Sequence, residues 1–251
     1  MLKGLGVDVL TFPDSTSGRT RIDSVLMAQK VKNVTGFEVM PHICCRDKNA
    51  IAVRSTFLGA SINDINNFLI ITGDPIPVMA RQVVKSVFNF DSVGLMRIAD
   101  EMNSEALKDS PLTYGGAINQ SRRRIESEIK RVQKKMEAGA EFFLTQPVFT
   151  AEDAERLRRV KEETGARILC GIMPLVSRKN ALFMKNEISG VNVTDEVIER
   201  YPETADREDG ENVGVELAKE MIAATRDFAD GYYFSFPFNR TYLLKRIIQE
   251  V

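Results

Sequence analysis

The chain has 251 residues, a net charge of −1, 43% apolar residues and 27% charged residues, which is the composition of a globular protein. No apolar run approaches the roughly 20 residues that a membrane span needs, and no signal peptide follows Met1. The near-zero charge argues against a nucleic-acid partner held mainly through phosphates. The three cysteines form no CxxC pair and there is one histidine, which excludes the usual Cys/His zinc sites; the odd cysteine count favours a cytoplasmic location.

Short apolar runs alternate with longer amphipathic segments along the chain. Seven runs rich in Val, Ile, Leu and Phe predict parallel strands buried on both faces: Val7–Phe12, Phe37–Ile43, Asn67–Gly73, Leu112–Ile118, Glu141–Gln146, Arg167–Met173 and Tyr232–Phe236. The amphipathic segments predict helices over Arg21–Val34, Asn49–Leu58, Ser92–Met102, Arg122–Ala138, Ala151–Thr164, Ala181–Glu187, Glu211–Phe228 and Thr241–Val251.

Several helix ends carry capping signals. Thr150, Asn180 and the segment Asp47–Asn49 are expected to begin helices. Glycines are expected to end segments at Gly36, Gly139, Gly165 and Gly231. The polar stretch Tyr201–Asn212 predicts one surface loop before a helix.

Polar residues follow every predicted strand, and this pattern decides between two architectures. A doubly wound sheet would bring together only the strand ends beside its switch point, whereas a barrel brings all of them to one mouth. The polar residues are Thr11, Asp14, His42, Arg46, Asp47, Thr72–Asp74, Tyr114–Asn119, Gln146, Ser177, Asn239 and Arg240. We therefore predict an α/β protein of the (β/α)8 TIM-barrel class, with residues 1–251 forming a single domain.

Three strand-end residues are candidates for recognition of a ligand. The carboxylate of Asp74 could accept hydrogen bonds from a heterocycle, and the amide of Gln146 can both donate and accept. Each could equally serve its own turn. His42 lies at the predicted mouth, where a functional and a structural role are about even. Cys44 and Cys45 are expected to be small buried residues.

Two further features could bind a phosphate or approach a ligand closely. Paired glycines at Gly115 and Gly116 end a strand, although a plain turn explains a lone pair better. Arg131, Lys134 and Lys135 are expected on one helical face, which could hold a phosphate. Because Glu126, Glu128 and Glu137 interleave, spacing alone favours a solvated surface helix.

Five segments taken together resemble the methylenetetrahydrofolate reductase family, most closely its bacterial form associated with methyltransferase modules. They are Pro41–Asn49, Ile71–Pro75, Glu137–Ala140, Thr145–Phe149 and Gly171–Leu175, in this order. The resemblance runs from about residue 5 to the C-terminus. It implies a TIM barrel that holds FMN (or FAD) and transfers hydride between the flavin and 5,10-methylenetetrahydrofolate, giving 5-methyltetrahydrofolate.

The resemblance also assigns residues by position. It implies cofactor contacts from Thr11, His42, Ile71, Thr72, Gly73, Gly116, Ala117, Ile118, Arg131, Lys134 and Lys135. It makes Asp74 a catalytic residue near the flavin and the folate, and it assigns folate contacts to Asp74, Gln146 and Arg240. No metal is implied.

Two departures from the family pattern stand out. A catalytic glutamate in a Glu-x-x-Pro-Pro-like segment on the first barrel strand has no counterpart, and Glu38 only mimics it because it belongs to the strand leading to His42. Arg178 replaces an aromatic residue found in NAD(P)H-using members, which favours another electron donor or a partner protein.

These departures leave two functions open. One is a flavin-dependent reductase; the other is a flavin- or folate-binding barrel subunit with little activity alone that acts with an electron-donor or methyltransferase partner. A homo-oligomer is left open. A Schiff-base lyase ranks last because no lysine is predicted at the inner end of a strand.

The length of 251 residues suits one barrel of about 250 residues, yet only seven of eight strands are found. The family match starts at the second strand. We therefore expect a further N-terminal strand, carrying the catalytic acid, in the native chain.

Overall fold

The chain divides into two compact units. The computed structural model describes residues 2–188, 190–203 and 206–249. The N-terminal unit comprises Gly6–Ala117 and Gln133–Glu141, and the C-terminal unit comprises Met1–Leu5, Ile118–Val132 and Phe142–Val251. Helix α4 (Ile125–Glu137) begins in the C-terminal unit and ends in the N-terminal unit.

The N-terminal unit is built on parallel strands. They are β1 (Val9–Phe12), β2 (Glu38–Cys44), β3 (Asn67–Ile71) and β4 (Thr113–Ile118), the last residue of which belongs to the C-terminal unit. Each strand pairs in parallel with the next, in registers that place Thr11 beside Met40 and His42 beside Leu69. The buried apolar residues of β2 and β3 have no polar alternation, as expected of strands covered on both faces.

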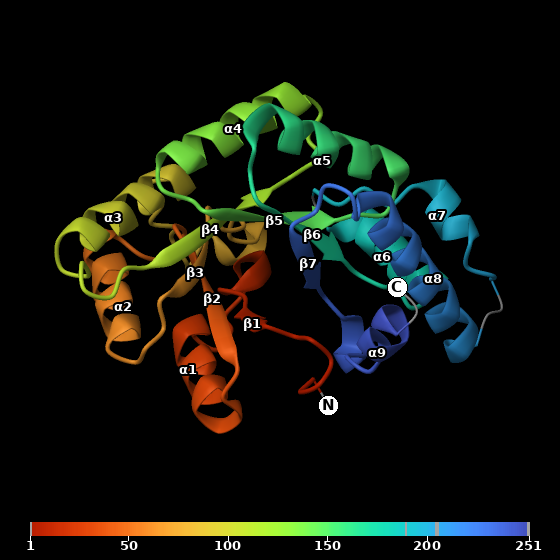
Figure 1. The fold of residues 1–251 in the computed structure, drawn as a ribbon, viewed down its shortest axis with the longest axis horizontal. Helices are drawn as coiled ribbons and strands as arrows, with labels where there is room; N and C mark the ends of the chain where they lie inside the picture. Colours follow the sequence, from red (N-terminus) through yellow and green to blue (C-terminus); the bar gives the residue numbers. More distant parts are fainter. Residues whose placement is uncertain (1, 189, 204–205, 250–251) are drawn as a thin grey trace. The chain divides into compact units, whose positions relative to one another are not determined.

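Helices α1 (Ser24–Thr35), α2 (Ala50–Ser61) and α3 (Ser92–Ser104) connect these strands. Helix α1 packs against β1 and β2, and α3 packs against β3 (Figure 1). The Phe57 ring of α2 meets the Phe68 ring of β3 edge to face, with centroids 5.0 Å apart. Asn49 caps α2 through its side chain, as predicted, and Gly36 ends α1 with a φ of 73°.

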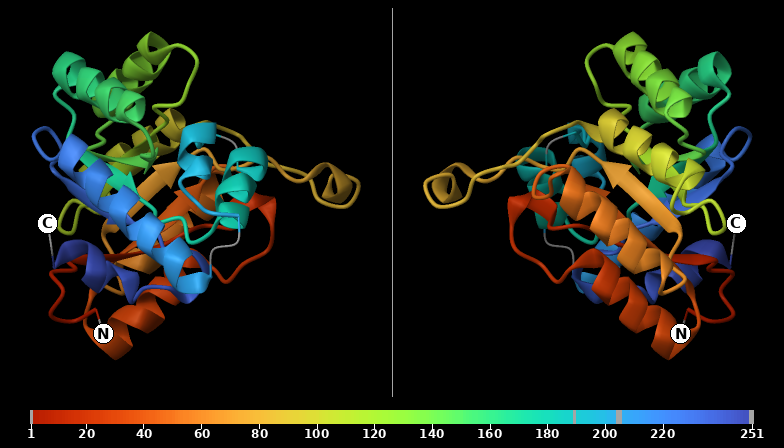
Figure 2. Two further views of the ribbon diagram at one scale, coloured as in Figure 1. Left: turned by 90° about the vertical axis from the view of Figure 1, so that its right-hand side faces the viewer. Right: turned by 90° about the vertical axis from the view of Figure 1, so that its left-hand side faces the viewer.

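One segment of the N-terminal unit, residues 75–90, extends away from the rest of that unit (Figure 2). We call it the 75–90 arm. It carries the short 3₁₀ helix η2 (Val78–Ala80), where the Met79 side chain is 94% exposed. Buried Ile76 and a hydrogen bond from the Val87 N–H to the Arg46 carbonyl (2.7 Å) fix its base.

The C-terminal unit repeats the strand–helix pattern. Strands β5 (Phe142–Pro147), β6 (Ile168–Ile172) and β7 (Gly231–Phe234) pair in parallel in chain order. The helices are α5 (Ala151–Thr164), α6 (Arg178–Glu187), α7 (Asp195–Glu199), α8 (Arg207–Thr225) and α9 (Leu243–Ile248). Thr150 caps α5 by accepting from the Asp153 N–H, and Gly165 ends it at a φ of 68°, both as predicted.

The order of elements identifies the fold class. Seven strands in the described part of the chain alternate with helices, and neighbouring strands within each unit are parallel. This is a TIM-barrel-like α/β fold, as the pattern of strand and helix signals predicted. No helix in the described ranges is both long and apolar enough to cross a membrane.

Three local predictions were wrong, and one short helix was not predicted. Ser177, not Asn180, caps α6, because α6 begins earlier than its apolar residues do. The stretch Tyr201–Asn212 is not one surface loop, since Tyr201 is buried and α8 already begins at Arg207; residues 204–205 lie outside the described residues. Gly231 begins β7 instead of ending a helix. The short helix α7 was not predicted, because its five residues are too few to show a helical period.

Candidate functional site

In the N-terminal unit, the ends of β2 and β3 carry most of the predicted site residues. His42 lies near the end of β2 and is 7% exposed. Its carbonyl accepts a hydrogen bond from the Ser24 hydroxyl (2.7 Å), while its Nε2 atom is buried without a partner in the described structure. Burial lowers the pKa of His42 to about 4, although the nearby Asp14 carboxylate opposes this shift. The imidazole is therefore neutral at pH 7.

Asp74 follows β3 and is exposed. Its Oδ2 atom accepts from the Ser17 N–H (2.6 Å), and its carbonyl accepts from Arg46 Nη1 (3.0 Å). The contact to Ser17 fixes the carboxylate against the loop after β1, where Ser17 has a φ of 57°. The Asp74 carboxylate is thus oriented but still open to solvent, so it can accept a further hydrogen bond.

Gly73 has a conformation that other residues rarely adopt. Its φ is 90°, and a Cβ atom there would lie 2.9 Å from the Cys44 Cβ atom. The residues before it secure the end of β3, because the Ile71 carbonyl accepts from the Cys45 thiol (3.4 Å) and the Thr72 carbonyl accepts from the Cys45 N–H (3.2 Å). Ile71, Thr72 and Gly73 are all half-buried.

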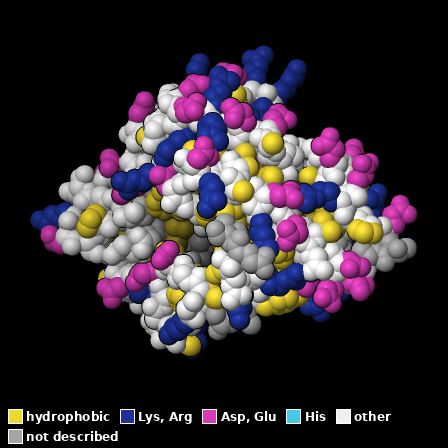
Figure 3. Space-filling view, turned by 45° about the vertical axis from the view of Figure 1, so that its right-hand side comes forward, with side chains coloured by type: hydrophobic (Ala, Val, Ile, Leu, Met, Phe, Trp, Pro, Cys, Tyr) yellow, Lys and Arg dark blue, Asp and Glu magenta, His cyan; other side chains and the backbone are white. Residues whose placement is uncertain are grey.

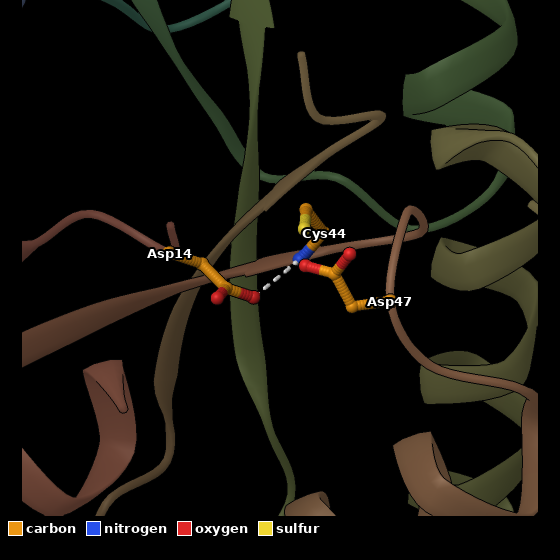
Figure 4. Close-up of side chains that lie close together, drawn as sticks. All are labelled: Asp14, Cys44 and Asp47. Atoms are coloured by element: carbon orange, nitrogen blue, oxygen red, sulfur yellow. Dashed lines mark hydrogen bonds between the residues drawn. The ribbon is translucent and has the colours of Figure 1, made fainter. Parts of the chain in front are cut away.

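Asp14, Cys44 and Asp47 lie close together beside this strand end, with their potential ligand atoms within 4.8 Å of one another (Figure 4). Asp14 accepts from the Cys44 N–H (3.1 Å) and pairs with Lys48 (3.2 Å), while Asp47 pairs with the buried Arg46 (2.6 Å). Burial raises the pKa of the Cys44 thiol to about 11. Both carboxylates already neutralise cations and the thiol is protonated, so the cluster stabilises the turn after β2 instead of favouring a metal ion.

Cys44 and Cys45 are buried and unbonded to other sulfurs, as predicted. Burial also raises the pKa of Cys45 to about 12. Thiols of this kind are poor nucleophiles at neutral pH, because the thiolate is the reactive form.

The remaining N-terminal-unit candidates lie on β1, β4 and α4. Thr11 is half-buried on β1, Gly116 is buried on β4, and Ala117 is half-buried. The Ala117 carbonyl accepts a hydrogen bond from Lys135 Nζ, and Lys135 is 4% exposed. Lys134, by contrast, is exposed. Of these two lysines, only Lys134 is therefore open to solvent, whereas Lys135 is committed to the end of β4.

In the C-terminal unit, Gln146 is half-buried on β5, beside a shift in register between Leu144 and Pro147. The Gln146 carbonyl accepts from the Gln120 side-chain amide (3.0 Å) and the Thr145 hydroxyl (2.7 Å). The Gln146 carbonyl therefore helps to hold the irregular end of β5 in place. Its side-chain amide makes no hydrogen bond to another described residue and stays available for a ligand.

Arg131 and buried Ile118 also belong to this unit. The Nε atom of Arg131 lies 3.7 Å from the Glu128 carboxylate, which also pairs with Arg122 (2.8 Å). Glu128 is 2% exposed and accepts from the Asn119 N–H (3.0 Å). Sequence analysis treated Glu128 only as a neutralising surface charge, whereas it ties the end of β4 to α4.

Arg240 follows β7, on the turn that includes the 3₁₀ helix η3 (Pro237–Asn239). It donates to the carboxylate of Glu211 (2.7 Å), and its guanidinium carbon lies 5.4 Å from the Phe238 ring centroid. Glu211 was not predicted as a site residue, because the sequence places it in a polar stretch at the start of a predicted helix.

Two other residues noted in the sequence serve structure. Arg178 donates to the carbonyls of Ile198 (3.1 Å) and Tyr201 (3.4 Å), so its side chain supports α7. Glu38, at the start of β2, is 56% exposed and pairs with Lys32 (3.2 Å). Glu38 lies at the opposite end of β2 from His42. The role of catalytic acid is therefore not assigned to Glu38.

Acidic and basic side chains are intermixed over the face shown in Figure 3, without a large region of one sign. Ion pairs on α5 follow this pattern, such as Arg159 with Glu163 (2.6 Å) and with Glu126 (2.8 Å).

The chain matches the family model for methylenetetrahydrofolate reductase over residues 2–250. It belongs to the methylenetetrahydrofolate reductase family. The resemblance drawn from the five sequence segments is thereby confirmed.

A curated protein of low sequence identity shows the same family relationship. The 5,10-methylenetetrahydrofolate reductase of Salmonella typhimurium is 25% identical over 174 residues, which cover 68% of this chain and 55% of that protein. The chain thus spans about half the length of this curated relative.

Two solved structures are similar in fold. A protein from Clostridium thermocellum described as binding two copies of 5-methyl-5,6,7,8-tetrahydrofolic acid has a TM-score of 0.68 at 16% identity, covering 100% of this chain and 86% of that one. The 2,3-dimethylmalate lyase, a member of the PEP mutase/isocitrate lyase superfamily, has a TM-score of 0.53 at 16% identity, covering 99% and 73%. At these identities the likeness concerns the fold.

Proposed function

We propose that this chain is a flavin-dependent reductase that interconverts 5,10-methylenetetrahydrofolate and 5-methyltetrahydrofolate by hydride transfer from reduced FMN (or FAD). The observation that carries this proposal is the family match over residues 2–250. The fold similarity to a protein that binds 5-methyltetrahydrofolate supports folate as the ligand.

The residues of the N-terminal unit fit a flavin. The buried Nε2 atom of His42 has no partner in the described structure and offers a hydrogen-bonding group to a polar ring edge. The left-handed backbone of Gly73 keeps side-chain atoms away from the turn after β3. Thr11, Ile71 and Thr72 would contribute to the lining, and exposed Lys134 would meet a phosphate. When bound, the flavin supplies hydride at its ring.

Two side chains fit the folate. The Asp74 carboxylate is exposed and held in place by Ser17, so it can accept hydrogen bonds from the N–H and amino groups of a pterin. The Gln146 side-chain amide can donate and accept hydrogen bonds, and it makes none to another described residue. Each assignment stands on its own residue and is tested by its own variant.

A second function is favoured by one observation. Glu38, the superficial counterpart of the family's catalytic glutamate, is exposed and paired with Lys32, so no described residue takes the role of that acid. The alternative is therefore a flavin- or folate-binding subunit with little activity alone, which acts with an electron-donor or methyltransferase partner.

The first experiment is the absorption spectrum of the purified protein after desalting and after incubation with FMN. Flavin absorption that stays with the protein supports the proposal. A protein that is colourless and takes up no added FMN contradicts it. Oxidation of 5-methyltetrahydrofolate with an artificial electron acceptor then separates the two functions, because a flavin-loaded protein without turnover favours the subunit.

The folate roles predict that Asp74→Asn and Gln146→Ala lower folate turnover about tenfold or more, while the Kd for FMN changes less than about twofold. Turnover and FMN titration on the same samples measure both effects. Asp195→Asn and Gln133→Ala are matched controls, because both residues are exposed. Equal losses of FMN affinity and turnover in the Asp74 or Gln146 variant would contradict the assigned roles.

A further inference from the structure

The turn after β7 is tied to the first turns of α8 by one buried carboxylate. Glu211 is 6% exposed, and its Oε1 atom accepts from Arg240 Nε (2.7 Å), Arg207 Nε (2.9 Å) and the Tyr242 hydroxyl (2.6 Å). Burial opposes ionisation, but these hydrogen bonds outweigh it and lower the pKa of Glu211 to about 2. The carboxylate is therefore ionised at neutral pH.

This arrangement leaves one edge of the Arg240 guanidinium uncommitted. Glu211 engages the Nε atom, and no other described residue accepts from Nη1 or Nη2. The side chain keeps 18% of its surface exposed. A guanidinium presents two nitrogens in a fixed fork that matches a carboxylate, so the remaining edge suits a planar anion.

The turn beneath Arg240 is strained in a way that keeps an aromatic ring beside it. Phe238 and Asn239 have φ values of 55° and 58°, a conformation that non-glycine residues rarely adopt. Phe238 is 73% exposed, and its ring centroid lies 5.4 Å from the Arg240 guanidinium carbon. Such strain persists only where the surroundings impose it, and the hydrogen bond from Arg240 to Glu211 attaches the end of this turn to α8.

We propose that Glu211 is a positioning residue that orients Arg240 so that its two terminal nitrogens bind a carboxylate of the folate substrate. This inference rests on the proposed function for its ligand. A purely structural ion pair would be complete with Arg207, which lies four residues earlier on the same helix. The additional hydrogen bond from Arg240, which is 29 residues away, holds the Arg240 guanidinium in one orientation. No described residue accepts a hydrogen bond from the remaining edge of that guanidinium.

The ligand-free protein tests the positioning itself. The Nε–H of Arg240 should give a distinct ¹H–¹⁵N signal that exchanges slowly with water, because a buried carboxylate accepts from it. Arg240→Gln identifies the signal by its loss. We expect Glu211→Gln to shift the signal and to speed its exchange at least about tenfold, because hydrogen bonds to charged groups are strong. The matched control is Glu220→Gln, which also lies on α8 and which breaks an exposed pair with Arg200, the residue after α7.

Turnover and binding of 5-methyltetrahydrofolate test the consequence. Glu211→Gln should raise the KM and Kd for folate about tenfold and change kcat less than about twofold, since the interaction orients the ligand in both ground and transition states. Arg240→Gln should do the same, and the double variant should be no worse than Arg240→Gln alone. If Glu211→Gln unfolds, Arg240→Lys replaces it, because an ammonium cannot engage both partners through a planar fork.

The outcomes separate the two proposals. An unchanged Arg240 signal in Glu211→Gln, or additive effects of the two substitutions, overturns the positioning role. A wild-type protein that protects the Arg240 Nε–H but binds no 5-methyltetrahydrofolate overturns the proposed function, and with it the ligand assigned to Arg240.

Discussion

His42 is the single histidine of the chain, so its titration can be measured without ambiguity. Its pKa is about 4 in the folded protein and about 6.5 when exposed, so the unfolded chain binds the proton more tightly between these values. Stability from the neutral imidazole is complete above pH 6.5 and decreases as the pH falls toward 4. From pH 7.5 to 5.0 we expect the free energy of unfolding to fall by about 2 kcal/mol.

Urea denaturation at the two pH values measures this change. His42→Gln is the control, since its amide does not titrate. In the variant, the free energy of unfolding should change little between pH 7.5 and 5.0, because the carboxylates of the protein protonate mainly below pH 5. The same decrease in both proteins would contradict the assignment to His42.

The backbone conformation at Gly73 requires a glycine. At a φ of 90°, an added Cβ would lie 2.9 Å from the Cys44 Cβ atom and 3.1 Å from its sulfur. We expect Gly73→Ala to lower the free energy of unfolding by about 1–3 kcal/mol. Gly59→Ala is the matched control, because nothing lies within 4 Å of its added Cβ and it is helical. Equal stability of the two variants would show that the turn adapts.

The strand-end positions of the proposed site residues could be predicted from sequence, whereas two buried carboxylates could not. His42, Asp74 and Gln146 lie at or just after strand ends, and strand ends can be located from apolar runs. Glu211 and Glu128 were missed because burial of a carboxylate depends on distant partners. Glu211 is buried by Arg240 and Tyr242 from beyond β7, and no local spacing indicates this contact.

Helix and strand positions could be predicted where local signals agree. Helix α5 begins and ends where Thr150 and Gly165 predict, because a capping hydroxyl and a left-handed glycine both act within one turn. Helix α8 begins earlier than predicted because Asp206 caps it inside a polar stretch, where the apolar period is not yet visible. The 75–90 arm has no hydrophobic period, so its extension from the N-terminal unit could not be predicted.

The 75–90 arm should be the first part of the N-terminal unit to be cleaved by trypsin. Its middle is exposed, with Val83 at 87%, and its Arg81 and Lys85 are potential cleavage sites. Exposed segments with little buried surface open at low free-energy cost, and cleavage follows that opening. We expect the earliest fragments from this unit to end at Arg81 or Lys85, as identified by mass spectrometry.

The control is a variant in which Arg81 and Lys85 are both replaced by Gln. This change removes the two trypsin sites of the arm without changing buried contacts of apolar side chains. The first cleavage in that variant should be slower and should move elsewhere. Earliest cleavage of the wild-type unit within α1 or α2 would contradict the low local stability of the arm.

For the whole molecule, a bound cofactor should stabilise the fold by mass action. A ligand at about 100 times its Kd adds about 2.7 kcal/mol, and for a chain of this size each kcal/mol raises Tm by about 2–4 °C. FMN at that concentration should therefore raise Tm by about 5–10 °C, measured by differential scanning calorimetry. If Lys134 meets the phosphate, Lys134→Ala should reduce the shift given by FMN but not that given by riboflavin, which has no phosphate. Because Lys134 is exposed, the substitution should leave the Tm of the free protein nearly unchanged. Equal shifts with FMN for wild type and Lys134→Ala would remove the phosphate role from Lys134, and no shift with either flavin would contradict flavin binding by this chain.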